Sequence, residues 1–452
     1  MKLCLGIDIG TTSTAAVVWD PDSGKAVEIM SAPHGAAVDG LPEHHAEQDA
    51  DVLLESAKTM IGKVASRFGS AIQAVGVTGQ MHGVVLVDEK LNPICNLVTW
   101  QDRRAESEGF IERLKDKTGS NRISGGYGAV TLAWLSSKGL LQNASKASTI
   151  QDLLVARLVG AKTPFTDFSD ACSWGFFDES SGKWNFDQLD RAEIPRSLLP
   201  NPVIPGSVAG RVSRGSENEY RVPESIPVVT AIGDNQASIY ASTADHVAER
   251  VLILSLGTSA QISAVMPQGF RPSKNDTKPT FEYRPYLGDR VVGVVPSYTG
   301  GMVLDWFVAT LGSWCKDLGL GDLDKKTIFE RLNRLGSEAL ESDLSAKPTI
   351  FGERFLPDLK GTIEGIGPDN FSLGGFYKAF INGVIKNLND LMAPQCLDGR
   401  NLIVGTGNAL RLQPLIQACV REVFKLPLKL CEFSEEAAQG AARLASLVAA
   451  DG

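Results

Sequence analysis

Basic residues are the minority charge in this sequence, with 44 Lys and Arg against 53 Asp and Glu and a formal net charge of -9. A nucleic-acid-binding surface needs clustered Lys and Arg, and no run of such residues occurs. The composition therefore argues against a nucleic-acid partner. It leaves a small anionic ligand open, because backbone N–H groups can bind phosphate without basic side chains.

Cysteine is scarce, and its seven copies are scattered without a Cys-x-x-Cys pair. This usage is typical of a reducing compartment, where a buried cysteine acts as a small apolar residue. The first residues carry one lysine, and Asp8 interrupts their apolar run, so neither a signal peptide nor a membrane span is predicted. We therefore expect a cytoplasmic protein without a membrane partner, present as a monomer or a homodimer.

The Walker A sequence Gly-x4-Gly-Lys-Ser/Thr is absent too, which excludes a P-loop ATPase. A chain of 452 residues is too long for one ordinary core and predicts two domains of roughly 200 residues each. Alternating strand and helix patterns predict the α/β class. We place the boundary near residue 245, which gives domains 1–244 and 245–452.

Periodicity predicts elements along both halves. A segment from about 196 to 227, rich in Pro, Gly and Ser, is interpreted as surface loop. Strands are expected at 3–9, 13–19, 251–256, 260–265 and 291–295, and helices at 51–68, 301–316, 375–393, 409–423 and 435–450.

Two similar segments stand out, LGIDIGTTSTAAVVW at 5–19 and LILSLGTSAQISAV at 252–265. In each, an apolar strand ends at a glycine followed by hydroxyl residues, and a second strand begins. Such a turn can present backbone N–H groups and hydroxyls to phosphate oxygens. For one copy an ordinary hairpin is the alternative. Two copies predict two related domains that each hold phosphate, through Thr11 and Thr12 and through Gly257, Thr258 and Ser259.

Only the first copy has an acid before its turn, Asp8. A carboxylate beside phosphates repels them unless a divalent cation lies between, so Asp8 predicts a Mg²⁺ ion, bound directly or through water. The pair of turns is therefore interpreted as a site for Mg-nucleotide.

A third motif is AIGDNQAS at 231–238, in which an apolar strand leads to Asp234. A carboxylate at the end of a buried strand can accept a proton from a hydroxyl that attacks a γ-phosphate. The alternative is a helix N-cap, and the two roles are compatible. Asn235 stands beside this acid.

Polar residues also gather at GQMHGVV (79–85) and TWQDRR (99–104), where they interrupt apolar segments near predicted strand ends. Gln80, His82, Trp100 and Asp102 could bind and stack against a polyhydroxylated ligand. A structural histidine and a core tryptophan are the alternatives. The arginine pair 103–104 is interpreted as a solvated helix start.

In the second half, SYTGGMVLDWF places Gly300 and Gly301 at a helix N-terminus, a plausible nucleotide-facing position. IVGTGNALR (403–411) is a strand, a glycine turn and a helix start, where backbone could lie flat against adenine or ribose. A plain glycine-rich loop is the alternative for each.

Taken in order, these motifs resemble the FGGY family of carbohydrate kinases over essentially the whole chain. The motifs are Asp-x-Gly-Thr-Thr, Gly-Gln-Met-His-Gly, Trp-Gln-Asp, Gly-Asp-Asn-Gln, Gly-Thr-Ser and Gly-Thr-Gly, at 8–12, 79–83, 100–102, 233–236, 257–259 and 405–407. The resemblance implies two ribonuclease-H-like (actin-like ATPase) domains, with a sugar and MgATP in the cleft between them.

The resemblance also implies residue roles, with Asp234 as the catalytic base and Asp8 on the Mg²⁺ side. The two hydroxyl-rich turns would face the phosphates. Gly405, Gly407 and Asn408 would line the adenosine pocket. The positions that fall where the family contacts its sugar are Met81, His82, Asp102 and Asn235.

GQMHG and GDNQAS resemble the xylulose and sedoheptulose branch of the family rather than the glycerol kinases. Five further segments resemble kinases of sedoheptulose more than those of xylulose. They are LVTWQDRR, ACSWGFFD, PGSVAGRVS, GERFLPD and GGYGAVTLAWL. The expected product is sedoheptulose 7-phosphate. A xylulose or ribulose kinase is the alternative within the family, and an actin-like ATPase switch is the alternative from another class. GTGNAL departs from the family's usual glycine and alanine run, which leaves the nucleotide preference open.

Overall fold

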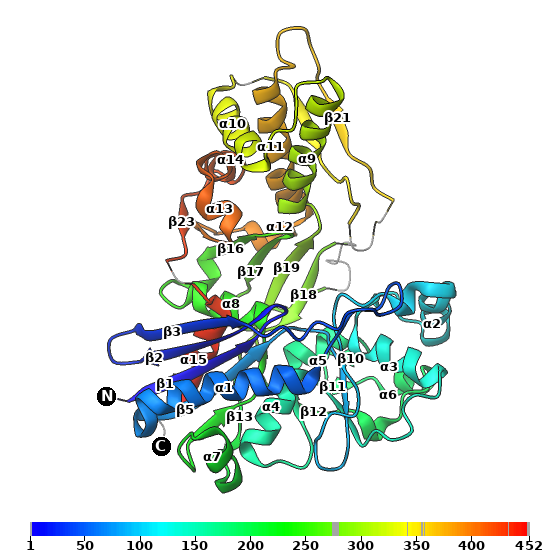
Figure 1. Ribbon diagram of the computed structural model, residues 1–452, viewed down its shortest axis with the longest axis vertical. Coiled ribbons are helices and arrows are strands. Elements are labelled where there is room, and N and C mark those ends of the chain that lie inside the picture. Colours follow the sequence, from blue (N-terminus) through cyan, green and yellow to red (C-terminus); the bar gives the residue numbers. More distant parts are fainter. Residues whose placement is uncertain are drawn as a thin grey trace. The chain divides into compact units, whose positions relative to one another are not determined.

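The computed structural model describes residues 2–273, 280–340, 342–353, 356, 358–432 and 434–449. The chain divides into two compact units, each with its own sheet (Figure 1). The first unit comprises residues 1–241, 285–289 and 433–452, and the second comprises 242–284 and 290–432. Within the described residues, no helix has both the length and the apolar character that a membrane span requires.

The sheet of the first unit has the strand order β13-β14-β5-β1-β2-β3, and β15 also pairs with β5. β2 is antiparallel to β1 and β3, β5 is parallel to β1, and β14 and β15 are parallel to β5. The predicted strands 3–9 and 13–19 are confirmed. The bounds are β1 (Leu3–Ile9), β2 (Ser13–Asp20), β3 (Lys25–Pro33), β5 (Ile72–Gly79), β13 (Val208–Arg211), β14 (Pro227–Val229) and β15 (Ile232–Gly233).

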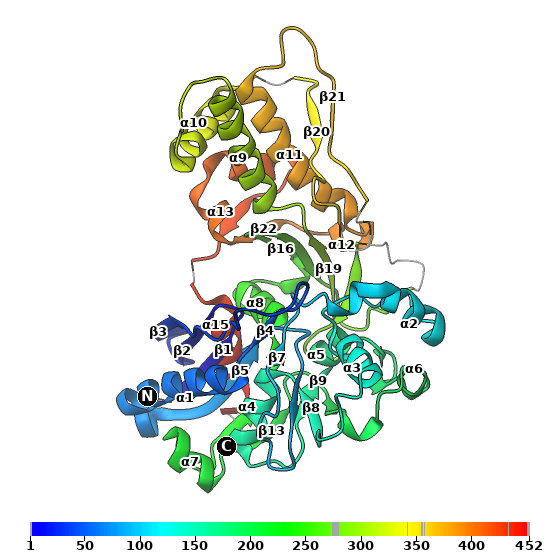
Figure 2. The ribbon, with the colours of Figure 1, turned by 45° about the vertical axis from the view of Figure 1, so that its right-hand side comes forward.

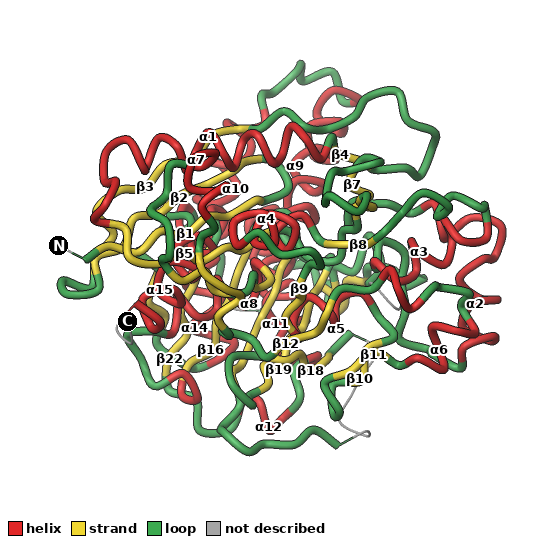
Figure 3. Tube along the Cα trace, turned by 90° about the horizontal axis from the view of Figure 1, so that it is seen from below, coloured by secondary structure: helices red, strands yellow, loops and turns green. Residues whose placement is uncertain are grey.

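Both faces of this sheet are covered, and β1 supplies each of them in alternation. Its odd-numbered residues are apolar and pack with α1 (Ala50–Phe68) and α4 (Ile150–Val159). Cys4 packs on the opposite face with α15 (Glu436–Ala449). In Figure 3 the strands lie between α1 and α15. Because successive side chains alternate, Gly6 and Asp8 belong to the α15 face.

Helix α15 approaches the first sheet backbone to backbone. A Cβ atom on Gly6 would lie 2.0 Å from the Ala438 carbonyl oxygen, and one on Gly76 would lie 2.0 Å from that of Ala441. Only glycine permits this approach. The predicted second domain, 245–452, includes this last helix, whereas the structure groups the helix with the first unit. Its glycine partners lie more than 360 residues earlier, so no local pattern indicates the pairing.

The direction of α15 follows from its contacts. The Arg443 guanidinium lies over the Trp19 ring at 4.3 Å, and Trp19 pairs with Cys4 at the start of β1. Ala438 and Ala442, which both precede Arg443 in α15, lie against Gly6, which is two residues further along β1 than Cys4. The helix therefore runs opposite to β1, and its N-terminus lies toward Asp8.

A further core of the first unit lies within residues 84–199, where short strands and helices surround Trp174 and Trp184. Its helices are α2 (Phe110–Thr118), α3 (Gly128–Ser137), α5 (Phe168–Trp174) and α6 (Phe186–Arg191). The remaining short strands of the first unit are β4 (Glu47–Gln48) with β7 (Leu97–Val98), β6 (Val85–Val87) with β8 (Lys146–Ser148), β9 (Phe165–Asp167) with β12 (Asn201–Val203), and β10 (Phe177–Asp178) with β11 (Lys183–Trp184).

The interpretation of 196–227 as surface loop is wrong in part. Strand β13 joins the first sheet there, and α7 (Arg214–Tyr220) follows it. Val212, Tyr220 and Val222 are buried in the same core as α1. These apolar residues hold the segment, although Pro, Gly and Ser dominate its composition.

The second unit repeats the strand plan of the first. Its order is β18-β19-β17-β16-β22-β23, with β17 antiparallel to β16 and β19, β22 parallel to β16, and β23 parallel to β22. β16 thus corresponds to β1, β17 to β2, β19 to β3 and β22 to β5. The bounds are β16 (Val251–Leu256), β17 (Ala260–Val265), β18 (Glu282–Pro285), β19 (Val291–Ser297), β22 (Leu402–Thr406) and β23 (Leu428–Leu430).

Helices of the second unit pack on this sheet around one apolar core. The predicted helix 409–423 is two helices, because Gln413 leaves helical geometry before Pro414, whose ring cannot sit inside a helix. Figure 2 shows the hairpin of β20 (Ser345–Lys347) and β21 (Thr362–Glu364) beside α11. The helices are α9 (Gly301–Asp317), α10 (Lys325–Glu338), α11 (Leu373–Leu391), α12 (Pro394–Leu397), α13 (Asn408–Leu412) and α14 (Pro414–Phe424).

Candidate active site

The turn between β1 and β2 is closed by a hydrogen bond from the Gly10 N–H to the Ser13 carbonyl oxygen at 3.0 Å. The indole Nε1–H of Trp100 donates to the Thr11 hydroxyl oxygen at 3.0 Å. Thr12 is exposed. Within the described residues, the N–H groups of Thr11 and Thr12 have no hydrogen-bond partner. The turn therefore presents two backbone donors and two hydroxyls, as its sequence predicts.

The turn between β16 and β17 has a similar form. The Gly257 N–H donates to the Ser259 carbonyl oxygen at 3.0 Å, and in the described part of the chain the N–H groups of Thr258 and Ser259 have no partner. Gly257 follows β16 as Gly10 follows β1. The position that corresponds to Asp8 is Ser255, so the second turn lacks the acid.

Asp8 lies in β1 and Asp234 directly follows β15, and β5 pairs with both strands. Asp8 pairs with Thr78 of β5, and Thr78 pairs with Ile232 of β15, two residues before Asp234. The Thr78 hydroxyl donates to the Ile232 carbonyl oxygen at 2.6 Å, which fastens β15 to β5. Because strands lie about 4.8 Å apart, roughly 10 Å separates the backbones of β1 and β15. Ile232 is buried on the α15 face, and Asp234 lies near enough to Asp8 for its charge to raise the pKa of that carboxyl, after the larger effect of burial.

The surroundings of Asp8 fit a divalent cation. Burial raises the pKa of its carboxyl well above the usual range, and the charges of Asp234 and Glu435 raise it further. Its buried Oδ1 has no hydrogen-bond partner within the described residues. Mg²⁺ commonly uses one or two protein carboxylates and completes its shell with water and phosphate oxygens. Nowhere in the described ranges do three or more His, Cys, Asp or Glu side chains form a group that could hold an ion, so any Mg²⁺ here needs other ligands.

Two of the predicted sugar residues, Met81 after β5 and Asn235 after β15, lie near the catalytic candidate. Met81 is buried, and its side chain fills the space where a Cβ atom on Gly233 would stand, at 2.8 Å. Gly233 directly precedes Asp234. The Asn235 N–H donates to Asp234 Oδ1 at 2.7 Å, and Asn235 Oδ1 is buried without a hydrogen-bond partner in the described part of the molecule.

His82 has a defined ring orientation. Its ring stacks on Tyr127 with centroids 4.8 Å apart, and its backbone has φ 73°. Nδ1 lies 2.6 Å from the Ser173 carbonyl oxygen, which can only accept, so Nδ1 carries the proton. In the neutral ring Nε2 is then an acceptor for a hydroxyl. The ring of His82 is thus held by Ser173 and Tyr127, and its contact with a sugar stays a prediction.

Asp102, predicted to contact a sugar, is 1% exposed and paired with Arg104. The guanidinium donates to both carboxylate oxygens at 2.8 Å, and the Ala46 N–H donates to Oδ2 at 2.7 Å. The interpretation of the arginine pair as a solvated helix start is wrong for Arg104, which is 6% exposed and also binds Glu47. A sugar contact of Asp102 stays a prediction. In the structure its carboxylate joins the Arg104 side chain to the Ala46 backbone.

The predicted nucleotide residues of the second unit meet at one edge of its sheet. A Cβ atom on Gly300 would lie 2.4 Å from the Ser259 carbonyl carbon, one on Gly301 2.3 Å from the Gly257 oxygen, and one on Gly407 2.4 Å from the Leu256 oxygen. These glycines permit backbone contacts that any side chain would block. Asn408 follows as the first residue of α13 and is exposed, whereas Gly405 is buried in β22.

Sequence reasoning missed three buried acids behind the first site, Asp152, Asp167 and Asp170. Burial raises the pKa of all three, that of Asp167 to about 7, and Asp152 and Asp167 raise that of Asp170 through their charges. Gln151 Nε2 donates to Asp170 Oδ2 at 3.0 Å. The segment TDFSDA shows two of these acids three residues apart, but nothing local indicates that they are buried together.

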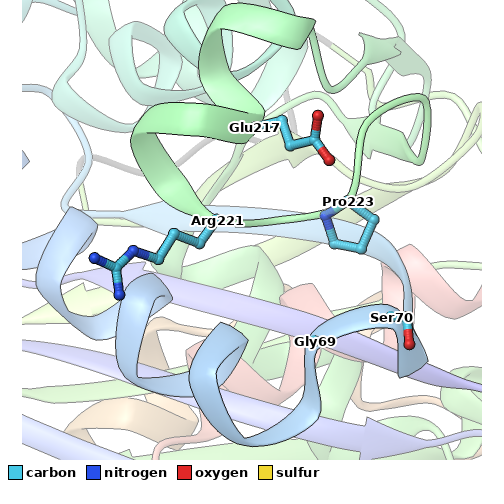
Figure 4. A pocket seen from close by; sticks show the side chains of 5 residues that line it. All are labelled: Gly69, Ser70, Glu217, Arg221 and Pro223. Atoms are coloured by element: carbon cyan, nitrogen blue, oxygen red, sulfur yellow. The ribbon is translucent and has the colours of Figure 1, made fainter.

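A surface hollow of about 530 Å³ lies elsewhere in the first unit (Figure 4). It is lined by Gly69, Ser70, Glu217, Arg221 and Pro223. The first two precede β5, whereas the site residues follow it. A strand of this length spans roughly 25 Å, so the hollow is separate from the candidate site.

Comparison with known proteins decides the family. The sequence model described as "FGGY family of carbohydrate kinases, N-terminal domain" matches residues 3–241. Human sedoheptulokinase is 32% identical over 470 residues, which cover 97% of this chain and 96% of that protein. This chain belongs to the FGGY family of carbohydrate kinases. Mouse sedoheptulokinase is 31% identical, with 94% and 93% covered, and the xylulose kinase of Lactococcus lactis is 26% identical, with 86% and 76% covered.

Solved structures of FGGY kinases share the fold. Lactobacillus acidophilus gluconate kinase superposes with a TM-score of 0.82 at 21% identity, covering 100% of this chain and 90% of that one. A xylulose kinase of the same organism gives 0.81 at 20% identity, with the same coverage. The predicted class, two actin-like α/β domains, is confirmed. The chain is a sugar kinase, a phosphotransferase that uses ATP and an alcohol acceptor.

Of the segment GERFLPD, Arg354, Phe355 and Pro357 lie outside the described residues.

The buried acids generate a prediction for stability. An aspartate in the unfolded chain ionises near pH 3.9, whereas folded Asp170 keeps its proton to higher pH because burial raises its pKa. Its contribution to stability is therefore complete below the unfolded pKa and is lost as pH rises toward the folded pKa. Asp152, Asp167 and Asp234 also face it, and all three are acids. Asp170→Asn stays neutral and should remove this loss.

Thermal unfolding between pH 5 and pH 8 measures the effect. The unfolding midpoint of Asp170→Asn, relative to the unaltered protein, should rise with pH. The control is Asp116→Asn, at an exposed position of α2. Its unfolding midpoint should differ from that of the unaltered protein by the same amount at every pH. A constant difference for Asp170→Asn as well would mean that this carboxyl is ionised in the folded protein throughout the range.

Proposed function

We propose that this kinase phosphorylates the terminal hydroxyl of sedoheptulose to give sedoheptulose 7-phosphate. The similarity to the human and mouse sedoheptulokinases over nearly the full length of both chains carries the proposal. Similarity to the L. lactis xylulose kinase is lower and covers less of either chain. A seven-carbon ketose also suits a site rich in hydrogen-bonding groups and rings. The enzyme would act in the cytoplasm, where ATP and phosphorylated sugars are retained.

Asp234 is the proposed catalytic base. It begins α8 (Asp234–Thr243) directly after β15, a placement fixed by the pairing of Ile232 with Thr78. When the acceptor oxygen forms its bond to the γ-phosphorus, the bond from phosphorus to the leaving ADP oxygen breaks, and Asp234 takes the hydroxyl proton. Asn235, Met81 and His82 would orient the sugar, together with Gln80, Trp100 and Asp102.

The two turns are the proposed phosphate sites. N–H groups and hydroxyls of Thr11 and Thr12, and those of Thr258 and Ser259, would donate to phosphate oxygens where charge develops. A Mg²⁺ ion held near Asp8 would neutralise part of the triphosphate charge. Gly300, Gly301, Gly405, Gly407 and Asn408 would bind the rest of the nucleotide through their backbone.

The substrate proposal is tested by measuring ADP release with a panel of ketoses. Sedoheptulose should give the highest kcat/KM, with xylulose and ribulose at least tenfold lower, and release without sugar should be negligible. A preference for xylulose or ribulose would replace the proposed substrate by a pentulose. ADP release that no sugar changes would instead indicate an ATPase switch.

A substitution tests the base. Asp234→Asn keeps the size of the side chain but removes its basicity, so kcat should fall by about 10²- to 10⁴-fold. Binding of a non-hydrolysable ATP analogue, measured by calorimetry, should stay within threefold. Near-normal kcat in this variant would contradict the assignment of Asp234.

A further inference from the structure

The first turn is held by its carbonyl oxygens. The Gly10 oxygen lies 3.3 Å from His34 Nε2 and accepts from Gln80 Nε2 at 3.4 Å. The Thr11 oxygen accepts from Gln48 Nε2 at 2.6 Å, and the Thr12 oxygen accepts from the His34 N–H at 3.3 Å. Three consecutive carbonyl groups are thus engaged, and the shortest bond comes from Gln48.

These bonds determine where the N–H groups point. In a trans peptide the C=O and the following N–H point in opposite directions. Fixing the carbonyls of Gly10 and Thr11 therefore turns the N–H groups of Thr11 and Thr12 away from the residues that hold them. These are the two donors that have no partner in the described part of the chain.

The three holding residues are themselves oriented. Gln80, 1% exposed, donates through Nε2 to Gln48 Oε1 at 2.7 Å, which leaves Gln48 Nε2 as the donor to the turn. The Ala36 N–H donates to His34 Nδ1 at 3.0 Å, so the neutral ring carries its proton on Nε2. Burial lowers the pKa of His34, which favours this neutral form. Each donor is therefore directed at a carbonyl oxygen.

The carbonyl oxygens of the second turn also accept hydrogen bonds, but from different donors. The Gly301 N–H donates to the Gly257 oxygen at 2.9 Å, and the Met302 N–H donates to the Thr258 oxygen at 2.8 Å. Here the first amides of α9 do what side chains do in the first unit. The first two carbonyl oxygens of each turn thus accept hydrogen bonds, although the donors are side chains in one unit and backbone amides in the other. Because the donors differ, the feature that the two turns share is that these carbonyls are hydrogen-bonded.

We propose that His34, Gln48 and Gln80 are positioning residues for nucleotide phosphate. They hold the carbonyls of the Gly10–Thr12 turn so that its N–H groups face a phosphate before it binds. The inference rests on the proposed role of this turn and adds three residues to it. Gln80, proposed above as a sugar contact, thereby gains a second role at the turn through its Nε2.

Substitution of Gln48 tests the proposal. Gln48→Met keeps the length and fills the space but cannot donate to the Thr11 oxygen. A lost hydrogen bond of this kind corresponds to an affinity change of about tenfold. We expect the Kd of Mg·AMP-PNP, measured by calorimetry on the full chain without sugar, to rise by about that factor. Adenosine, which has no phosphate, should bind with unchanged affinity in an NMR titration.

The matched control is Gln73→Met, because Gln73 Nε2 donates to the Ser70 carbonyl oxygen at 3.0 Å near the other end of β5. It should leave both affinities unchanged. Thermal unfolding checks that both variants fold. If Gln48→Met destabilises the chain, Gln48→Glu tests the same contact, since its carboxylate repels the Thr11 oxygen and should weaken Mg·AMP-PNP binding further.

The outcomes separate the inference from the proposed substrate. Unchanged Mg·AMP-PNP affinity in folded Gln48→Met, or an equal loss for adenosine, would overturn the positioning role. Because no sugar is present, either result stands whichever ketose the enzyme uses. Failure of the ketose panel would in turn leave the nucleotide measurement valid.

Discussion

A trans peptide group directs its carbonyl oxygen and its N–H in opposite directions, and both turns of this kinase depend on that constraint. A short glycine turn could adopt several peptide orientations, each with different donors exposed. Engaged carbonyls leave one orientation. In the first unit the donors are His34 after β3, Gln48 in β4 and Gln80 after β5, so the shape of the turn depends on elements that lie far apart in the sequence. Donors fixed in advance need little reorganisation when charge develops on a phosphate.

The two units share a strand plan but not a charge pattern. The order and direction of β3-β2-β1-β5 recur as β19-β17-β16-β22, and Gly10 corresponds to Gly257. The residue two positions before the glycine is Asp8 in one unit and Ser255 in the other. Asp8 lies on the α15 face, where burial raises the pKa of its carboxyl and the charges of Asp234 and Glu435 raise it further. The acids therefore belong to the first unit, which agrees with the proposed division between metal and sugar on one side and adenosine on the other.

Much of this could be predicted from the sequence because it is local. Strands β1 and β16, their turns and helix α1 all follow from short patterns, and the order of motifs indicated the family. The features that the sequence did not reveal depend on contacts between residues that are far apart in the chain. Helix α15 joins the first sheet through Gly6 and Gly76. Arg104 looks like a surface residue until Glu47 and Asp102 surround it. Gln48 lies 37 residues after Thr11, to which it donates a hydrogen bond. The two-residue strand β4 that contains Gln48 is too short to show a sequence pattern.

The most direct test of the account observes the turn amides themselves. In ¹⁵N-labelled, deuterated protein, addition of Mg·AMP-PNP should shift the backbone amide resonances of Thr11, Thr12, Thr258 and Ser259, because these N–H groups gain phosphate acceptors. The Gly10 and Gly257 amides, already bonded within their turns, should move less. Saturating nucleotide that leaves all four resonances in place would contradict the claim that these turns bind phosphate.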